Sequence, residues 1–187
     1  TIMATYGPRS VLWSERPGPF SDMSKALMRG LGSPNYCTHD DACAHNVNQA
    51  SYSLTGHGRG KWIYDFKNCR HIVVQGRNFL ESLKVGELNQ VLDALDKGCR
   101  LTCVDVRPTV TGLKAQQNLC IRPGTDLALN LAVLHVLIEE KLYDAAYVER
   151  YVQDFEALAD FVRSYSPKWD ESQCDIPADV IAELARS

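Results

Sequence analysis

The sequence predicts an α/β fold: a Rossmann-like, mostly parallel sheet flanked by helices, with a helical C-terminal extension. Three observations support this prediction. Apolar runs of strand length recur through the middle of the chain, segments of helical periodicity alternate with them, and glycine, proline or acidic residues mark the points of change. The resulting order, β-α-β-β-α, is typical of a parallel sheet that carries helices on its faces.

The middle of the chain shows this order most clearly. Residues 71–75 form a short apolar strand that stops at Gly76, and further strands are expected over 101–106 and 118–121. Ser82 is expected to cap a helix that ends at Gly98 and whose apolar positions follow the i, i+3, i+4, i+7 rule: Leu88, Val91, Leu92 and Leu95. The third strand leads into a nearly all-round apolar helix that extends to about Lys141, and such a helix is covered on most sides.

Capping residues, glycine and proline predict the elements before and after this region. A strand is expected over 10–13, a helix from Ser21 or Asp22 to Gly30 or Gly32, and a helix capped by Asp40 or Asp41 that the glycine-rich turn 56–60 ends. After Asp144 three helices are expected, over 145–152, 155–165 and 177–186, with Pro177 at the first helical position. We therefore predict a Rossmann-like domain over 1–143 and a helical extension over 144–187 that packs on it.

Composition excludes several classes of protein. The chain has 187 residues, of which 45% are hydrophobic and 23% charged, as in ordinary globular domains. No run approaches the ~20 apolar residues that span a bilayer, and no targeting segment is recognisable. The net charge of −3 argues against a nucleic-acid partner. Residues 144–187 carry −6 and residues 1–143 carry +3, so the first part favours an anionic ligand and the tail is expected to be a solvated cover.

The seven cysteines do not suggest a disulfide framework, because their number is odd and several lie in strand-like runs. No C-x-x-C pair occurs, which excludes a self-contained iron–sulfur cluster of the common spacing.

Two predicted strand ends carry candidate ligand-binding residues. Gly76 closes the first clear strand and is followed by Asn78, Glu81 and Ser82, and Asp105 closes the next strand. A glycine at one strand end lets the backbone approach a phosphate, and an acid at the neighbouring end accepts hydrogen bonds from ribose hydroxyls. The alternative is that both residues only form tight turns.

Asp126 and Cys43 each have two interpretations. Asp126 follows Gly124 at the start of the apolar helix, so it is either the N-cap or a carboxylate that pairs with the two donors of a guanine edge. Cys43 is either a buried helix cysteine or a thiolate ligand, since the amino end of a helix stabilises the anion. Cys37, His39, Cys43 and His45 also allow a structural zinc site, although their spacing is not a common zinc pattern.

Several strings together resemble the catalytic subunits of the molybdopterin oxidoreductases of the dimethyl-sulfoxide-reductase family. These strings occur in the family's order along nearly the whole chain: residues 32–35 with Thr38, His39 and Cys43, then 73–82, 104–109, 121–126 and 138–144. The first of them is most similar to thiosulfate, polysulfide and tetrathionate reductases. The chain departs from the family at Phe79 and Val106, where proline is usual, and these changes affect loop stiffness.

This resemblance implies a molybdenum (in some members tungsten) held by two molybdopterin guanine dinucleotides, and an enzyme of anaerobic respiration that reduces a sulfur oxyanion or polysulfide. By position, Cys43 matches the thiolate that ligates the metal. The dinucleotide contacts are matched by Gly76, Asn78, Glu81, Ser82, Asp105, Arg107, Gly124 and Asp126. The competing hypotheses are a non-enzymatic guanine-nucleotide-binding module and a small zinc-stabilised interaction domain.

The resemblance also implies that the chain is an internal portion of a longer subunit. The missing parts would hold a [4Fe–4S] cluster and the contacts to the other pterin, so the fragment alone is expected to bind no metal and to be inactive. Expected partners are the rest of the same subunit, an iron–sulfur electron-transfer subunit and a membrane-anchor subunit. The parent is expected to be periplasmic or membrane-associated on the exported side, with the cytoplasm as the alternative.

Overall fold

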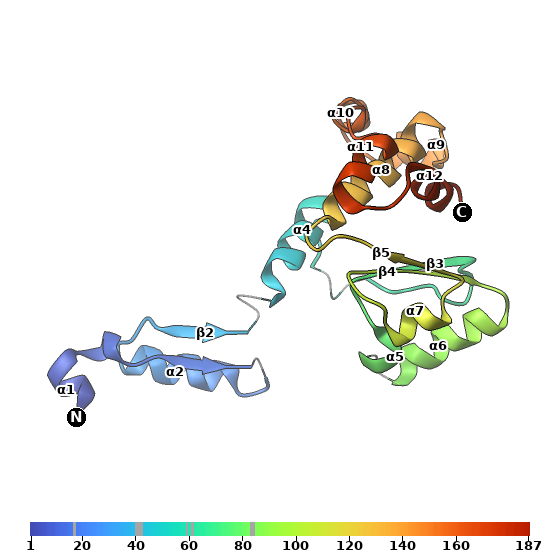
Figure 1. Ribbon diagram of the computed structural model, residues 1–187. Coiled ribbons are helices and arrows are strands. Elements are labelled where there is room, and N and C mark those ends of the chain that lie inside the picture. Colours follow the sequence, from blue (N-terminus) through green and yellow to red (C-terminus); the bar gives the residue numbers. More distant parts are fainter. Residues whose placement is uncertain (17, 40–42, 59, 61, 83–84) are drawn as a thin grey trace. The chain divides into compact units, whose positions relative to one another are not determined.

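A computed structural model describes residues 1–16, 18–39, 43–58, 60, 62–82 and 85–187 (Figure 1). The chain forms two compact units, residues 1–64 and 65–187, each with its own helices and strands. The units therefore divide at a different point from the 1–143 and 144–187 division expected from the sequence. Across the described residues, no helix is both long and apolar enough to cross a membrane.

The first unit combines a two-stranded parallel sheet with helices. Strands β1 (Trp13–Glu15) and β2 (Tyr36–Thr38) pair so that Ser14 lies opposite Cys37. The helical elements are α1 (Ile2–Tyr6), η1 (Pro8–Ser10), α2 (Ser21–Gly30) and α4 (His45–Thr55). The strand expected over 10–13 is thus wrong in position, because Pro8 starts a 3-10 turn that occupies residues 8–10.

The C-terminal ends of helices α2 and α4 lie where the sequence predicts them, whereas the N-cap of α2 differs from the prediction. The N-cap of α2 is Phe20, and Ser21 instead accepts a hydrogen bond from the N–H of Gly18 at 2.8 Å. Helix α4 ends at Gly56, whose φ of +71° is the left-handed conformation that glycine adopts at low cost. The proposed caps Asp40 and Asp41 lie outside the described residues.

Glu15 joins the three elements at the centre of the first unit. Its carboxylate accepts hydrogen bonds from the hydroxyl of Tyr36 (2.7 Å), the indole Nε1 of Trp13 (2.9 Å) and the hydroxyl of Ser24 (2.8 Å). These donors favour the ionised form, which lowers the pKa of Glu15 to about 2. β1, β2 and α2 are therefore held together by one anion.

The second unit contains the predicted parallel sheet. Strands β3 (His71–Gln75), β4 (Arg100–Asp105) and β5 (Gln117–Cys120) pair in parallel in the order β3-β4-β5. The expected α/β class and the three central strands are confirmed, with bounds that differ by at most one residue at each end. In β4, four consecutive residues are buried, as expected for the middle strand of a covered sheet.

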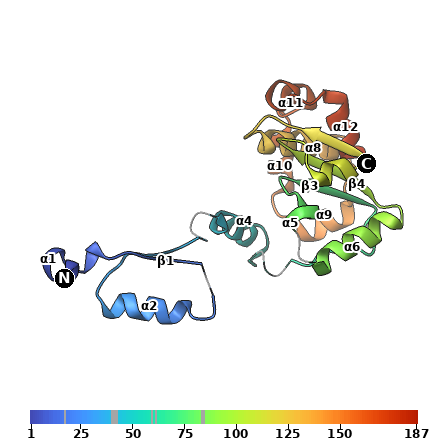
Figure 2. The same cartoon turned by 60° about the horizontal axis from the view of Figure 1, so that its bottom comes forward.

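Helices cover both faces of this sheet (Figures 1 and 2). On one side lie α5 (Phe79–Ser82), α6 (Val85–Asp96) and α7 (Val110–Lys114), and on the other lies α8 (Asp126–Glu139). The first core includes Ile72, Phe79, Val91 and Leu101, and the second includes Val104, Leu119, Leu129 and Ala132. Alternate residues of β4 thus enter opposite cores, which is the period-2 rule of a strand.

Two helix boundaries in this region correct the sequence prediction. Ser82 is the last residue of α5, and its hydroxyl donates to the carbonyl of Asn78 at 2.8 Å, so it does not cap α6. No element was predicted between the strands expected over 101–106 and 118–121, where helix α7 lies. This helix forms because the Thr109 hydroxyl accepts the N–H of Gly112 at 3.0 Å, which caps its first turn.

The C-terminal tail belongs to the second unit rather than forming only a solvated cover. It contains α9 (Ala145–Tyr151), α10 (Phe155–Val162), α11 (Pro167–Cys174) and α12 (Ala178–Arg186). Helices α11 and α12 pack against α8, and Cys174, Ile181 and Leu184 complete its core. Helix α11 was not predicted, and Pro177 is the N-cap of α12 instead of its first residue.

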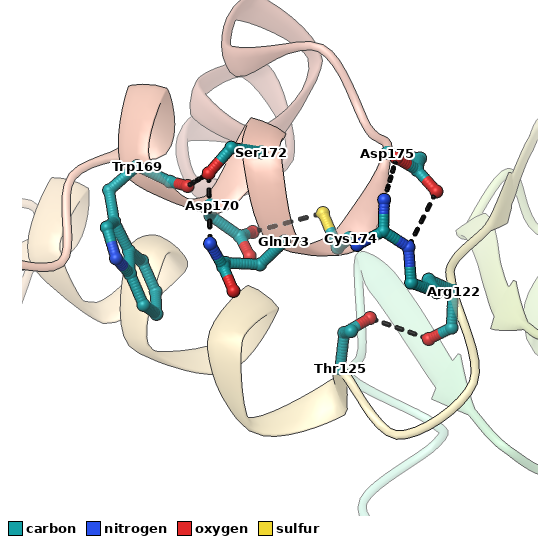
Figure 3. A network of polar contacts seen from close by, with 8 residues as sticks. All are labelled: Arg122, Thr125, Trp169, Asp170, Ser172, Gln173, Cys174 and Asp175. Carbon is teal, nitrogen blue, oxygen red and sulfur yellow. Dashed lines mark hydrogen bonds and ion pairs between the residues drawn. The ribbon is translucent and has the colours of Figure 1, made fainter.

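Two exposed ion pairs join the C-terminal tail to the rest of the second unit. Arg122, which follows β5, binds Asp175 with its Nε at 3.1 Å and its Nη2 at 2.5 Å (Figure 3). Arg186 of α12 binds Glu140 at the end of α8 in the same bidentate way. Both pairs are largely exposed, so they orient the tail more than they stabilise it.

Asp170 is a buried acid inside the tail packing (Figure 3). Its side chain is 0% exposed, and its Oδ2 accepts a hydrogen bond from the thiol of Cys174 at 3.3 Å. Its Oδ1 has no partner among the described residues. Burial raises the pKa of Asp170 and raises the pKa of Cys174 to about 11.

We predict that Asp170 makes stability depend on pH in a defined direction. Because its folded-state pKa lies above the value of about 3.9 for an unfolded aspartate, its contribution is full at low pH and is lost as pH rises through the folded-state pKa. Asp170→Asn should therefore gain stability relative to the wild type as the pH rises above about 4, as measured by urea unfolding at a series of pH values. The control Asp179→Asn, at an exposed acid of α12, should show no such gain; an equal gain in both would contradict the prediction.

Candidate functional site

The carboxyl ends of β3, β4 and β5 meet at one edge of the sheet because the strands are parallel. The N–H of Gly76 donates to the carbonyl of Val104 at 2.9 Å, and the N–H of Ile121 donates to the carbonyl of Asp105 at 3.0 Å. Gly76 and Asp105 therefore end neighbouring strands at the same edge, as the sequence predicted. In open parallel sheets this edge is where ligands bind.

Two glycines leave the backbone open at this edge. Gly76 has a φ of +61° and Gly124 a φ of +84°, which are conformations that favour glycine. Apart from the adjacent residues, no heavy atom of the described part of the chain lies within 4 Å of the position that a Cβ would occupy at either glycine. The backbone at both positions is thus accessible to a bulky anion such as a phosphate.

Asp126 is held by a residue distant in sequence. It is the first residue of α8 and the N-cap is Thr125, so the interpretation of Asp126 as the N-cap is wrong. Its Oδ1 accepts a hydrogen bond from Nε2 of Gln75, the last residue of β3, at 3.0 Å. Within the described part of the chain no donor reaches Oδ2, so this half-buried carboxylate keeps one oxygen for a ligand.

Gln75 was missed by the sequence reasoning. A signal was present, because Gln75 is the polar last residue of a strand whose centre is Ile72, Val73 and Val74. Its partner lies 51 positions away, and only the sheet geometry brings the two side chains together.

Asn78 connects two helices on one side of the sheet. Its Oδ1 accepts hydrogen bonds from the N–H (3.3 Å) and the hydroxyl (2.9 Å) of Thr111 in α7, and its Nδ2 donates to Glu81. The Thr111 hydroxyl also accepts the N–H of Leu80 at 3.2 Å. Thr111 is fully buried and was not predicted as part of this site. Asn78 therefore has a structural role, while Glu81 and Ser82 are exposed.

Asp105 is the last residue of β4, and Arg107 follows the strand at the same edge. Asp105 is half-buried, and its Oδ1 accepts the N–H of Val106 at 2.8 Å, which fixes the turn. Arg107 is exposed, and its Nη1 donates to the carbonyl of Pro108 at 3.1 Å. The guanidinium retains further donors that suit an anionic group.

Cys43 belongs to the first unit, whereas the residues above belong to the second. It lies two residues before α4, its N–H donates to the carbonyl of His39 at 3.0 Å, and its side chain is exposed. The interpretation as a buried helix cysteine is therefore wrong. Among the described residues, no three His, Cys, Asp or Glu side chains are grouped so as to hold a metal ion, so the proposed zinc site is not formed.

Comparisons with known proteins agree on one family. The family model described as "Molybdopterin oxidoreductase" matches residues 12–169. The chain is 38% identical to the thiosulfate reductase molybdopterin-containing subunit PhsA of Salmonella typhimurium over 185 residues, which are 99% of this chain and 24% of that protein. It is 31% identical to formate dehydrogenase H of Escherichia coli over 189 residues, which are 92% of this chain and 26% of that protein.

A solved structure gives the same result. Acetylene hydratase from Pelobacter acetylenicus matches with a TM-score of 0.78 and 28% identity, over 98% of this chain and 25% of that one. The chain thus spans about a quarter of the length of each of these relatives.

We predict that Asn78 stabilises the second unit without any ligand. Asn78→Ala removes the acceptor for two donors of Thr111, one of them the hydroxyl of a buried side chain, and should lower the free energy of unfolding by about 1–2 kcal/mol. Urea unfolding of the purified chain measures this change. The control Glu81→Ala removes only the exposed partner of Asn78 and should stay within about 0.5 kcal/mol of the wild type. A loss in the control equal to that of Asn78→Ala would contradict the assignment.

Proposed function

The chain belongs to the molybdopterin oxidoreductases, a family of enzymes, and from this premise we propose that it supplies the metal-ligating cysteine and the guanine-dinucleotide contacts of a catalytic subunit. Family membership implies a molybdenum or tungsten cofactor. The observation that carries the proposal is the arrangement at the strand ends of the second unit. The open backbone of Gly76 lies at the same edge as Asp105. Gln75, the residue before Gly76, binds Asp126 there.

The chemistry of the residues at this edge supports the proposal of a bound dinucleotide. The open backbone at Gly76 and Gly124 suits the phosphates, and Arg107 offers a cation for them. Asp105 can accept hydrogen bonds from ribose hydroxyls, and the exposed polar side chains of Glu81 and Ser82 are further proposed contacts. Asn78 positions this segment by accepting a hydrogen bond from the hydroxyl of Thr111.

Asp126 is the proposed guanine contact. Oδ2 and the remaining acceptor capacity of Oδ1 can accept from the two donors of a guanine edge, and Gln75 fixes the orientation of the carboxylate. Orientation matters because a ligand then loses less free energy in ordering the site.

Cys43 is the proposed protein ligand of the metal. Its thiol is exposed and close to the start of α4, whose N–H groups favour an anion. A soft thiolate suits such a metal. When bound, the cofactor would supply the transfer of electrons and of an oxygen or sulfur atom, while the chain provides ligation and orientation.

A sulfur oxyanion or polysulfide is the proposed substrate class. The thiosulfate reductase subunit is 38% identical over 99% of the chain, and formate dehydrogenase H and acetylene hydratase are 31% and 28% identical. The segment from Gly32 to Cys43 resembles that of sulfur-compound reductases, which supports the same choice. Assays of the full-length enzyme with thiosulfate, tetrathionate, polysulfide and formate test it, and activity with formate alone would contradict it.

The proposed partners follow from the length of the relatives. Since the chain spans about a quarter of them, the rest of the same subunit is the first partner. We further propose a second pterin dinucleotide and a [4Fe–4S] cluster in that remainder, an iron–sulfur electron-transfer subunit, and a membrane-anchor subunit on the exported side. Purification of the native complex and identification of its subunits by mass spectrometry test this composition.

We predict that Cys43→Ser in the full-length enzyme retains the pterin but loses turnover by orders of magnitude, because an alcohol oxygen is a harder and less acidic ligand. Metal K-edge absorption should show one sulfur scatterer fewer. The control Cys37→Ser, in β2, should leave the sulfur count and turnover unchanged. Loss of the scatterer in the Cys37 variant would show that the ligand is misassigned within this loop.

We also predict that Asp126→Asn lowers the guanine-dinucleotide content of the full-length enzyme. The amide places a donor against a donor of the guanine edge, which costs about 1–3 kcal/mol. Pterin and guanine nucleotide released from the purified enzyme measure the content. The matched control is Asp179→Asn, because Asp179 is likewise an acid in the first turn of a helix. Unchanged content in Asp126→Asn would leave Asp126 with only its bond to Gln75.

A further inference from the structure

Cys69 and Cys99 lie at the amino ends of β3 and β4, which is the end of the sheet opposite to the candidate site. In the register of these strands His71 lies opposite Arg100, and the N–H of Arg100 donates to the carbonyl of Arg70 at 2.9 Å. Cys69 and Cys99 are the residues just before Arg70 and Arg100. Their backbones are therefore adjacent, although the residues are 30 positions apart.

Both side chains enter the same core. Cys99 is buried with Ile72 and Leu101, and the half-buried Cys69 packs against this cluster. The N–H of Cys69 donates to the carbonyl of Phe66 at 3.4 Å, which forms a turn directly before the strand. The thiol of Cys69 donates to the carbonyl of His71 at 2.9 Å, and that of Cys99 to the carbonyl of Arg100 at 3.5 Å.

The thiol of Cys69 also acts on the thiol of Cys99. Burial raises the pKa of Cys99, and the neighbouring thiol of Cys69 raises it further through its charge and hydrogen bonding. This effect requires that the two sulfur atoms are near each other.

We propose that Cys69 and Cys99 are the site of a reversible disulfide that links the amino ends of β3 and β4. Disulfides join Cα atoms about 4.4–6.8 Å apart, and neighbouring strands lie about 4.7–4.9 Å apart. Extending the register places Cys99 opposite Arg70, so Cys69 lies one residue out of register, and the resulting diagonal of about 6 Å is still within this range. Both side chains already lie on the same side of the sheet.

The disulfide forms by exchange with a low-molecular-weight disulfide such as oxidised glutathione. Cys69, which is more exposed, attacks as its thiolate, releases one glutathione thiol and carries the other as a mixed disulfide. Cys99 then loses its proton and attacks the sulfur of Cys69, which releases the second glutathione thiol. Two protein thiols are oxidised and one reagent disulfide is reduced to two thiols. The raised pKa of Cys99 makes the second step faster as the pH rises.

The closed ring contains β3, the Gly76 turn, α5 and α6. Oxidation restricts the unfolded chain over this ring and so stabilises the second unit. The linked residues lie at the amino ends of the strands, whereas Gly76 and Asp105 lie at the carboxyl ends. The disulfide therefore acts on stability and leaves the candidate cofactor site unchanged.

Tryptic peptide mapping of the purified chain after treatment with oxidised glutathione tests the proposal. Trypsin cuts after Lys67, Arg70, Lys97 and Arg100, so the disulfide appears as the peptides 68–70 and 98–100 joined together. Mass spectrometry without reductant should find this product, and Cys69→Ser should abolish it. The matched control Cys120→Ser, at an exposed cysteine of β5, should retain it.

Thermal unfolding gives an independent readout. The oxidised wild type should have a higher Tm than the reduced protein, and Cys69→Ser should show no such difference. Recovery of the two peptides only as separate glutathione adducts would overturn the proposal, as would an equal rise of Tm in Cys69→Ser. Neither measurement uses the metal or the pterin, so the result does not depend on the proposed function.

Discussion

The parallel pairing of β3, β4 and β5 is the constraint on which the second unit depends. Parallel strands need crossover connections, and these become α5, α6 and α7 on one face, while α8 covers the other. The same pairing brings all carboxyl ends to one edge, so residues separated by whole helices meet there. The position of the candidate site thus depends first on the direction of the strands and only then on particular side chains.

Helix α8 links this edge to the C-terminal tail. Its first residue, Asp126, faces Gln75 at the strand ends, and its buried side packs on β4, β5, α11 and α12. Its apolar surface is therefore covered by the sheet on one side and by the tail on the other. This explains why an acidic tail contains a buried core: apart from the buried Asp170, its acidic and basic side chains lie outside the core, while Cys174, Ile181 and Leu184 lie against α8.

Local patterns predicted the elements that local forces determine. Strand β3, the ends of β4 and β5, and the stop of α4 at Gly56 follow from apolar runs and glycine conformation. Contacts between distant residues could not be predicted in this way. Ser82 has the chemistry of a cap but bonds within α5, and Asp126 is oriented by Gln75 from another strand. Helix α11 has a mixed surface whose buried residues are recognisable only once α8 lies beside it.

The proteins similar to this chain are named for different reactions. Proteins named for thiosulfate reduction, formate oxidation and acetylene hydration match it over nearly its whole length. A framework shared by proteins with such different reactions cannot by itself select a substrate. What the chain has in common with these proteins is therefore this framework, and the strand-end edge that we propose to bind an anionic ligand is one part of it. The elements beside this edge are joined by residues that contact no ligand in any role considered above: Thr109 and Thr111 are buried, and their hydrogen bonds cap α7 and join it to Asn78 and Leu80.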